Sequence, residues 1–466
     1  MSCIESCSGP AHKARVLQFG TGVFLRGFFD WMLQQARDAS KWQGFAIGVK
    51  LTSEGTLALA KASSHTHTTR GVLDGRNIEK HTALSVVEKW LNPYEAEGLE
   101  EFLASARLPS LDVVVSNSTE AGLAYERTER PAAGICPKSF PAKLTMWLHA
   151  RFEADSRLHV TLLPLELLED NGELLQDIVK RHADDWKLGS DFNDWLERNC
   201  DFRCTLVDRI VTKPSAQDDP LLTISEPYHL LAIDGDSSLE DRLPLKASGA
   251  NVIYTSKLLQ YRIRKVRVLN GAHHIMTFLG LSLGKRNVLE CINDPALGPF
   301  IRDTILNEVL PILPGDAQEL RSYAAAIFER FANPWLDHRL EAIAMNSSAK
   351  VLVRLIPSIS DYLQHFQQLP SRLVLALAAF LAYTGPIKGC EKEPVTDACK
   401  SITGLAESVA AAIAKLAEGS IFEAMPSTLT VPDADVTAGS DAKRPRIEVE
   451  PLSWQSTVTK EPSTGN

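Results

Sequence analysis

Residues 16–27 read VLQFGTGVFLRG. The first four of these residues form a short apolar run typical of a buried strand, and the apolar residues after Gly22 recur at helical spacing. The close pair Gly20 and Gly22 permits a tight turn, lets the backbone approach a pyrophosphate, and precedes a helix N-terminus with free N–H groups. Arg26 could add a direct contact to phosphate. The third glycine of the common dinucleotide motif is absent, so an ordinary strand–helix turn explains the segment equally well.

Apolar runs further along the chain predict more strands of the same kind. Residues 45–49, 111–115 and 160–163 are each typical of a buried strand. Helical patterns lie between them, for example at residues 97–106 and 142–152. Alternating strands and helices predict a parallel α/β sheet.

From about residue 251 the pattern becomes mostly helical. The predicted helices span residues 264–283, 299–310, 316–332, 335–346, 350–369, 372–383 and 405–425. A polar, turn-rich segment at 234–238 precedes this change. We therefore expect an α/β domain at residues 14–235 and an all-α domain at 250–425. Residues 426–466 are rich in Pro, Ser, Thr, Asp and Lys without an apolar period, and we expect them to be disordered.

The composition limits the function. The chain has 466 residues, 44% hydrophobic and 23% charged, which excludes collagen, a coiled coil and wholesale disorder. A net charge of −9 argues against a general nucleic-acid-binding protein, which would have to neutralise phosphates. The longest strongly apolar run, residues 373–383, is too short for a membrane span, which needs about 20 residues. Eight scattered cysteines without a CxxC pair, and a first segment without an apolar core, indicate a cytoplasmic protein with reduced thiols.

Two further segments bear on a cofactor. SNSTEAG, residues 116–122, follows a predicted strand, and ligands of open α/β sheets lie beyond the carboxyl ends of strands. A polar loop whose Asn and Ser cap a helix explains this segment as well. The predicted strand at 45–49 is followed by KLTS, residues 50–53, with no acid for a ribose hydroxyl. Lys50 could favour a 2′-phosphate or simply be exposed, so the choice between NAD and NADP stays open.

The segment YRIRKVRVLNGAHH, residues 261–274, carries three polar groups at helical spacing. Asn270 and His273 are neighbours on a helix. Lys265 lies about 80° from His273 around the axis and about 12 Å along it. A substrate could therefore lie along this face. A basic helix with a solvated charged face explains the same spacing, because the segment holds four cations.

His65 and His67 alternate as residues of a strand do. Two histidines without a third ligand nearby are weak grounds for a metal site. We therefore expect no metal, and we interpret both histidines as surface residues.

Taken together, these segments resemble the mannitol dehydrogenase family of polyol-specific long-chain dehydrogenases. The match runs in one order along about residues 14–385 and rests on several short motifs. These motifs are QFGxGxFLR at 18–26, SNxTEAG at 116–122, PAKLT at 141–145, PxEL at 164–167 with Asn171-Gly172, TLVDRIV at 205–211, RKV at 264–266 with LNGAH at 269–273, and RFxNP at 330–334. Within the family, the chain is most similar to the uronate branch, the tagaturonate (altronate) oxidoreductases.

The resemblance implies a Rossmann-type N-terminal domain followed by an all-α C-terminal domain. It also implies metal-independent hydride transfer with NAD, with NADP not excluded. The family's Lys-x4-Asn-x2-His signature falls on Lys265, Asn270 and His273, the expected catalytic residues. The expected cofactor-binding residues are Phe19, Gly20, Gly22, Phe24, Arg26, Asn117, Thr119 and Glu120. The expected substrate-binding residues are Asn171, Asp208, Arg262 and Arg264, the two arginines being candidates for a substrate carboxylate.

The resemblance further implies a sugar acid or polyol as substrate, and reversible reduction of D-tagaturonate to D-altronate. Lys265 would be the general acid and base, Asn270 would hydrogen-bond the developing oxyanion, and His273 would hold a substrate hydroxyl. Leu167 stands where the polyol branch has an Asn, which speaks against mannitol. The alternatives are a fructuronate reductase, a mannitol-type polyol dehydrogenase, or a catalytically silent binding protein on the same fold. The segment after Tyr383 is shorter than in the family.

Overall fold

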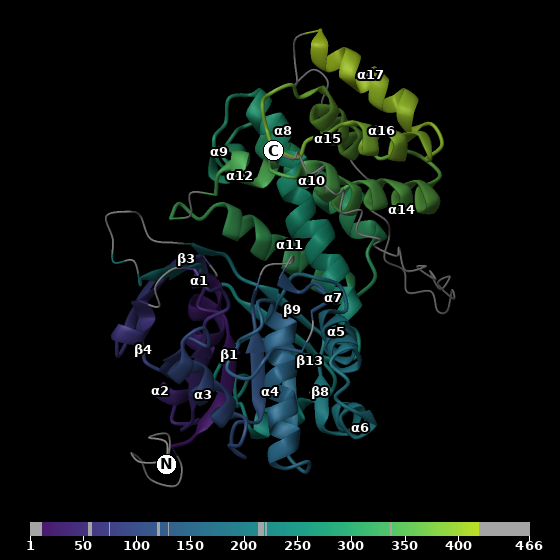
Figure 1. Ribbon diagram of the computed structural model, residues 1–466. Helices are drawn as coiled ribbons and strands as arrows, with labels where there is room; N and C mark the ends of the chain where they lie inside the picture. The colour runs from purple at the N-terminus through teal and green to yellow at the C-terminus, as the bar shows by residue number, and fades with distance from the viewer. Residues whose placement is uncertain are drawn as a thin grey trace, which may run out of the picture. The chain divides into compact units, whose positions relative to one another are not determined.

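A six-stranded parallel sheet organises the first half of the chain (Figure 1). The strand order is β5-β2-β1-β6-β7-β8, and every neighbouring pair is parallel. The strands are β1 (Ala14–Phe19), β2 (Phe45–Val49), β5 (Val87–Leu91), β6 (Val113–Ser116), β7 (Val160–Pro164) and β8 (Cys200–Phe202). The four strands predicted from apolar runs are confirmed, because each run is buried within this sheet.

The computed structural model describes residues 12–418, except 55–57, 74, 119–121, 129, 213–218, 220 and 336–337. These residues lie within one compact unit that ends at Pro426. The predicted disordered tail at 426–466 lies outside the described residues, as do Thr119 and Glu120. Within the described part, no helix combines the length and the apolar character that a membrane crossing requires.

Helices cover the sheet, and its alternating side chains enter two apolar clusters. The helical segments are α1 (Val23–Leu25), the π-helix η1 (Arg26–Asp30), α2 (Trp31–Asp38), η2 (Ala58–Lys61), α3 (Ala96–Ser105), α4 (Phe140–Ala154), α5 (Asn171–Asp185), α6 (Ser190–Asn199) and η4 (Ser237–Asp241). Along β1, Leu17 and Phe19 join the cluster with α3 and α4, whereas Val16 joins the cluster with η1 and α2. This alternation follows from the pleat of a strand, whose successive side chains point to opposite faces.

Two smaller sheets were not predicted from the sequence. One has the order β10-β11-β3-β4 and the other β13-β12-β9. Their strands are β3 (His65–Leu73), β4 (Arg76–Leu84), β9 (Thr205–Asp208), β10 (Val211–Thr212), β11 (Thr223–Ser225), β12 (Leu230–Asp234) and β13 (Val252–Thr255). Strands β12 and β13 pair in parallel, so the first half extends past residue 235. The polar segment at 234–238 is therefore part of a connection within this sheet.

The interpretation of His65 and His67 as surface residues is wrong. Strand β3 lies between β11 and β4, and both histidines are buried. The ring of His67 hydrogen-bonds with Thr223 Oγ1 at 2.8 Å and lies beside the ring of Trp31, 6.3 Å between centroids. Period-two alternation cannot tell the buried face of a strand from the exposed one when its side chains are polar.

The second half is helical, as predicted. Its segments are α7 (Leu258–Arg264), the π-helix η5 (Lys265–Asn270), α8 (Gly271–Ser282), α9 (Val288–Ile292), α10 (Leu297–Thr304), η6 (Ile305–Val309), η7 (Leu310–Ile312), α11 (Ala317–Phe331), α12 (Leu340–Ala344), α13 (Ser347–Arg354), α14 (Ile356–Phe366), α15 (Ser371–Ala382), α16 (Glu393–Lys400) and α17 (Leu405–Ala417). The single helix predicted at 350–369 is two helices, because Pro357 in the first turn of α14 has no N–H to donate. Within the predicted helix at 335–346, the described residues form the short helix α12.

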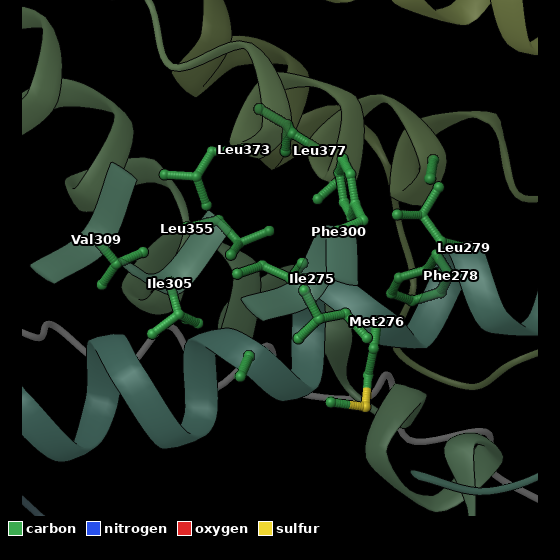
Figure 2. Packing of buried hydrophobic residues seen from close by; sticks show 14 of the residues in the cluster. Ile275, Met276, Phe278, Leu279, Phe300, Ile305, Val309, Leu355, Leu373 and Leu377 are labelled. Carbon is green, nitrogen blue, oxygen red and sulfur yellow. The ribbon is translucent and has the colours of Figure 1, made fainter. Parts of the chain in front are cut away.

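Helix α8 lies at the centre of the helical core. Residues 271–280 are all buried, and the apolar cluster around them draws on α10, η6 and α15. Figure 2 shows Ile275, Phe278 and Leu279 of α8 within a cluster that includes Phe300 and Leu377. Because α8 is enclosed in this way, the polar groups just before it have fixed positions, and they belong to the site described next.

Candidate active site

The helical run α7–η5–α8 places the three predicted catalytic residues on one cavity. Lys265 begins the π-helix, Asn270 ends it, and His273 lies in the first turn of α8. The sequence predicted a continuous α-helix here. The π-helix adds about one residue per turn, and such segments are frequent at functional sites. All three side chains nevertheless line the same cavity of about 510 Å³.

Both halves of the chain contribute walls to this cavity. The first half contributes Phe24, Asn117, Ser118, Leu165, Glu166, Leu167, Val207, Asp208, Arg209 and Ile210. The second half contributes Lys265, Leu269, Asn270, His273, His338, Ala342, Ile343, Lys350 and Arg354. The residues of the first half lie mainly at the carboxyl ends of β6, β7 and β9. Strands β6 and β7 belong to the parallel sheet, and ligands of such sheets bind beyond the carboxyl ends of the strands.

Lys265 is held at the end of β9. Its side chain is buried, and Nζ donates a hydrogen bond to the carbonyl oxygen of Val207 at 2.6 Å. Burial lowers the pKa of Lys265, the Asp208 carboxylate opposes this, and Arg330, Arg262 and Arg354 add to the lowering. A lysine with a lowered pKa can both release and accept a proton near neutral pH.

The carboxylate of Asp208 is engaged by the helical half. Arg330 Nη1 and Nη2 donate to Asp208 Oδ2 and Oδ1 at 3.1 and 2.9 Å. The hydroxyl of Tyr323 donates to Oδ2 at 3.3 Å. Burial favours the protonated form of Asp208, but Arg330 and Lys265 outweigh it and lower the pKa of this carboxyl. Asp208 therefore lies at the cavity as a paired carboxylate.

His273 presents a ring nitrogen without a partner. Its Nε2 is buried and has no hydrogen-bond partner among the described residues. The ring packs against those of Phe331 and His338, with centroids 4.8 and 4.6 Å away. Burial lowers the pKa of His273 well below its usual value, and the nearby His338 and Arg354 add to the effect. The imidazole is therefore neutral, and it can accept or donate one hydrogen bond at this nitrogen.

Glu166 ties together the strand ends that form the opposite wall. Its Oε1 accepts hydrogen bonds from the backbone N–H and the hydroxyl of Ser118 at 2.8 and 3.0 Å. Its Oε2 accepts from the hydroxyl of Ser116 at 3.0 Å. Asn117 Nδ2 donates to the carbonyl oxygen of Leu165 at 2.9 Å. The loops after β6 and β7 are therefore fixed to each other. Asn117 lines the cavity, and its contact with a cofactor stays a prediction.

The glycine turn after β1 fits a dinucleotide. Gly20 has a φ of +125°, and a Cβ there would lie 2.8 Å from Leu25 Cδ1 and 3.0 Å from the carbonyl oxygen of Asn117. Among the described residues, no atom lies within 4 Å of the Cβ position of Gly22, so the backbone there is open to an approaching group. The helical run that starts at Val23 has no side-chain cap. Its first N–H groups are therefore available for a phosphate.

The other predicted cofactor residues lie in different surroundings. Phe24 lines the cavity, whereas Phe19 is buried in the core against Phe102 and Phe140. Arg26 is buried and donates to the carbonyl oxygen of Leu221. Thr119 and Glu120 are outside the described residues.

Lys50, which follows β2, is buried. The interpretation of Lys50 as an exposed residue is therefore wrong. Lys50 directly follows the carboxyl end of β2, a strand that pairs with β1. A 2′-phosphate contact by Lys50 stays a prediction.

Three of the predicted substrate residues do not line the cavity. Asn171 is buried, and its Nδ2 donates to the carbonyl oxygens of Pro164 and Glu166, both at 2.9 Å. It thereby holds the loop that carries Glu166. Arg262 donates to the carbonyl oxygen of Leu168. Arg264 lies over two aromatic rings, those of Tyr261 and Tyr323, at 4.7 and 4.2 Å.

Comparison with known proteins places the chain in a family. The family model of the mannitol dehydrogenase Rossmann domain matches residues 14–247, and that of the mannitol dehydrogenase C-terminal domain matches residues 257–426. The chain belongs to the mannitol dehydrogenase family. The sequence resemblance is thereby confirmed, as is the expected order of a Rossmann-type domain and a helical domain.

Two relatives within the mannitol dehydrogenase family carry the name altronate oxidoreductase. The protein of Halalkalibacterium halodurans is 37% identical over 388 residues, 79% of this chain and 75% of the relative. The protein of Bacillus subtilis is 33% identical over 389 residues, 80% of each chain. The chain is therefore similar to these relatives over most of both sequences.

Two solved structures show the fold of the mannitol dehydrogenase family. D-Sorbitol dehydrogenase in a substrate-free form is 20% identical, with a TM-score of 0.76 over 89% of this chain and 96% of that one. Mannitol 2-dehydrogenase of Pseudomonas fluorescens, in a ternary complex with NAD and D-mannitol, is 18% identical, with a TM-score of 0.66 over 90% and 96%. At these identities the likeness concerns the fold.

Outside the family motifs quoted above, the cavity holds two cations that the sequence analysis missed. Lys350 and Arg354 lie one turn apart on α13 and both line the cavity. Lys350 Nζ donates to the carbonyl oxygens of Ile343 and Met345 at 3.0 and 2.6 Å. Arg354 Nη1 lies 3.1 Å from Nδ1 of His274. Their i,i+4 spacing on a predicted helix was a signal, since it puts both on one face.

The cavity offers acid–base and anion-binding groups. Among the described residues, no three His, Cys, Asp or Glu side chains gather as they would around a metal ion. The arrangement has a lysine with a lowered pKa, a neutral histidine, an asparagine and three further cations, Arg209, Lys350 and Arg354, around one space. These groups can donate a proton to an oxygen, stabilise its negative charge and bind a carboxylate.

Proposed function

We propose that this chain interconverts a keto-uronate and an aldonate, D-tagaturonate and D-altronate, by NAD(H)-dependent hydride transfer. One observation carries the proposal: a single cavity brings Lys265, Asn270 and His273 to the carboxyl edge of a Rossmann-type sheet. The similarity to relatives named altronate oxidoreductase supports the choice of substrate.

The glycine turn and the loop after β6 are the proposed cofactor site. Gly20 and Gly22 would let the dinucleotide backbone approach, while Phe24 and Asn117 would line the end at the cavity. Bound there, the nicotinamide supplies or accepts the hydride. Thr119 and Glu120 stay proposed contacts on the strength of the motif alone. None of residues 50–53, which directly follow β2, is an acid that could bind a ribose hydroxyl, so NADPH is the alternative cofactor.

Lys265 would exchange the proton of the reaction. As an ammonium it donates a proton to the ketone oxygen during reduction, and as an amine it accepts the hydroxyl proton during oxidation. Asn270 would donate a hydrogen bond to the same oxygen while negative charge grows on it. His273 would bind a neighbouring hydroxyl through its unpartnered Nε2. These roles use only groups that line the cavity.

The substrate carboxylate requires a cation, and the structure changes our candidates for it. Arg262 and Arg264 make contacts outside the cavity wall, whereas Lys350 and Arg354 line it beside His273. We therefore propose Lys350 and Arg354 in this role. A guanidinium suits a carboxylate because it can donate two parallel hydrogen bonds.

The proposal is tested by following NADH and NADPH oxidation with D-tagaturonate, D-fructuronate and D-fructose in parallel. Turnover with D-tagaturonate is expected. Lys265→Ala should lower kcat by about 10²–10⁴-fold and leave NADH binding unchanged, because the side chain lies at the reacting oxygen. Lys257→Ala, an exposed lysine just before α7, is the matched control and should keep full activity. Turnover that survives in Lys265→Ala contradicts the assignment.

The same assay separates the alternatives. Turnover with D-fructuronate alone would make the chain a fructuronate reductase, and turnover with D-fructose alone would make it a polyol dehydrogenase. A folded protein that neither binds NADH nor turns over any of the three substrates would be a binding protein on this fold. The pair Lys350 and Arg354 favours an acidic substrate over a neutral sugar, because a polyol offers no charge to either side chain.

A further inference from the structure

We propose that Arg330 is a positioning residue for Lys265. It holds Asp208 and the end of β9 in place. It also offsets part of the negative charge of Asp208, so that the ammonium of Lys265 can release its proton near neutral pH. The proposal rests on the function proposed above, in which Lys265 is the general acid and base. Arg330 itself does not line the cavity.

The guanidinium of Arg330 binds two buried carboxylates at once. It donates twice to Asp208, as described above, and also twice to Glu226, from Nε to Oε2 at 2.8 Å and from Nη2 to Oε1 at 2.7 Å. The side chains of Arg330, Asp208 and Glu226 are each exposed by 3% or less. The guanidinium also lies over the ring of Tyr228, 4.2 Å from its centroid. Such bidentate pairs fix geometry as well as charge.

These contacts fix the chain segment that accepts the hydrogen bond of Lys265. Lys265 Nζ donates to the carbonyl oxygen of Val207, and Asp208 is the next residue along β9. Two residues further on, the backbone N–H of Ile210 donates to Glu226 Oε1 at 2.7 Å. Arg330 comes from α11, in the other half of the chain. One side chain of the helical half therefore anchors residues 208–210 through both carboxylates.

The charges around Lys265 come from four different elements. They are Asp208 on β9, Arg330 on α11, Arg262 on α7 and Arg354 on α13. Asp208 stabilises the ammonium, and the three arginines destabilise it. Glu226, the other carboxylate that Arg330 binds, is also acted on by the buried guanidinium of Arg209. Arg330 thus prevents the carboxylate of Asp208 from holding the proton of Lys265 too tightly.

Removing the charge of Arg330 should therefore strengthen the hold of Lys265 on its proton. The groups that act on Lys265 include Arg330 and Asp208 but not Glu226. Burial already raises the pKa of Glu226, and Arg330 opposes this, so Glu226 should take up a proton when the arginine is lost, but its proton does not replace the positive charge beside Lys265. Asp208 keeps its hydrogen bond from Tyr323 and stays beside Lys265. Removing the charge of Asp208 instead takes away the group that stabilises the ammonium. The two substitutions should act in opposite directions.

The experiment measures the proton on Lys265 without relying on turnover. The full-length protein is treated with acetic anhydride across a pH range, and acetylation of Lys265 is quantified by mass spectrometry, with exposed Lys257 as the internal reference. The midpoint is the pH at which acetylation of Lys265 is half-maximal. For Arg330→Gln we expect this midpoint to rise by about one pH unit. For Asp208→Asn we expect the midpoint to fall by a similar amount. For Arg330→Lys, which keeps the positive charge, we expect the midpoint to stay near the wild-type value.

Activity gives the second readout. The rising limb of aldonate oxidation against pH should shift as the acetylation midpoint does in each variant. A loss of activity with unchanged midpoints, or shifts of the same sign in Arg330→Gln and Asp208→Asn, would overturn the proposal. If Arg330→Gln does not fold, the test rests on Asp208→Asn. An acetylation midpoint in Asp208→Asn that is as high as in the wild type then overturns the proposal. Opposite shifts in a protein that turns over no substrate would instead overturn the proposed function and leave the positioning of Lys265 standing.

Discussion

Lys350 and Arg354 show how a helix face acquires a function. Both side chains lie on α13, one turn apart, while Val351 of the same helix is buried in the core. The helix is thus held by its apolar face, and its basic face borders the cavity that contains Lys265 and His273. A negatively charged substrate would meet positive charge from two side chains fixed to one rigid element.

The first prediction concerns Arg354. Arg354→Gln should raise KM for D-tagaturonate by about 10–100-fold, since a hydrogen bond to a charged group contributes about 1.5–3 kcal/mol. It should lower kcat far less than Lys265→Ala does, because Lys265 stays in place and loses only one of the three cations that lower its pKa. Steady-state kinetics measure both values. Arg321→Gln, an exposed arginine on α11, is the control and should change neither. An unchanged KM in Arg354→Gln would move the carboxylate site elsewhere.

The catalytic set followed from the resemblance to the mannitol dehydrogenase family, because the spacing alone fits a solvated basic helix as well. Lys265, Asn270 and His273 were placed on one helical face by spacing alone, and the structure brings them to one cavity. The same reasoning could not separate Arg262 from Arg354. Both are cations on helices, and only the packing of α7 and α13 decides which cation borders the cavity. Glu166 lay within a quoted motif, yet its bonds to Ser116 and Ser118 depend on two strands that meet only in the folded sheet.

At the scale of elements, the turn between β1 and α1 separates two uses of glycine. At Gly20 the need is steric and conformational: φ is +125°, and a Cβ would press on Leu25 and on the backbone of Asn117. At Gly22 the backbone is extended, with φ −68° and ψ 160°, and nothing crowds a Cβ. The second glycine therefore has no structural reason within the described residues, and a bound dinucleotide would supply one.

This difference gives a paired prediction. Gly20→Ala should lower the free energy of unfolding by about 1–3 kcal/mol, because a non-glycine residue is strained at this φ. Gly22→Ala should leave stability nearly unchanged but raise the Kd for NADH at least about tenfold, the cost of about 1.4 kcal/mol. Thermal unfolding and NADH fluorescence titration measure the two effects. Equal NADH affinity in Gly22→Ala and wild type would exclude close approach of the cofactor at this residue.

The elements that the sequence predicted share a physical cause. A strand inside a parallel sheet is covered on both faces, so β2 and β6 are continuous apolar runs that stand out. Strand β3 reads HTHTTRGVL, and its buried His67 hydrogen-bonds with Thr69 of the same strand and with Thr223 of β11. Because β3 is polar, it does not stand out in the sequence as an apolar run. The pair Asp74-Gly75 between β3 and β4 is nevertheless a strong hairpin signal in the sequence.

At the scale of the whole molecule, the two halves are joined by polar contacts around the cavity. Arg330 of α11 binds Asp208 and Glu226 of the first half. Beside it, Asn333 Nδ2 donates to the carbonyl oxygen of Arg70, and the guanidinium of Arg70 lies 4.0 Å over the ring of Trp335. A ligand in the cavity would touch both halves, because each contributes about half of the lining residues. Binding and stability of the described unit should therefore be coupled.

That coupling gives the last prediction. NADH alone should raise the thermal unfolding temperature, because it binds the folded chain only. D-Altronate added to NADH is a pair that cannot react, and it should raise the temperature again, each ligand contributing about 2.7 kcal/mol at 100 times its Kd. In Arg354→Gln the first increment should remain and the second should shrink, because the anchor of the carboxylate is gone. D-Mannitol at the same concentration, which has no carboxylate, should give the wild type little of the second increment. An altronate increment of full size in Arg354→Gln would show that the acid is held by other groups, and it would leave Arg354 without a role in choosing the substrate.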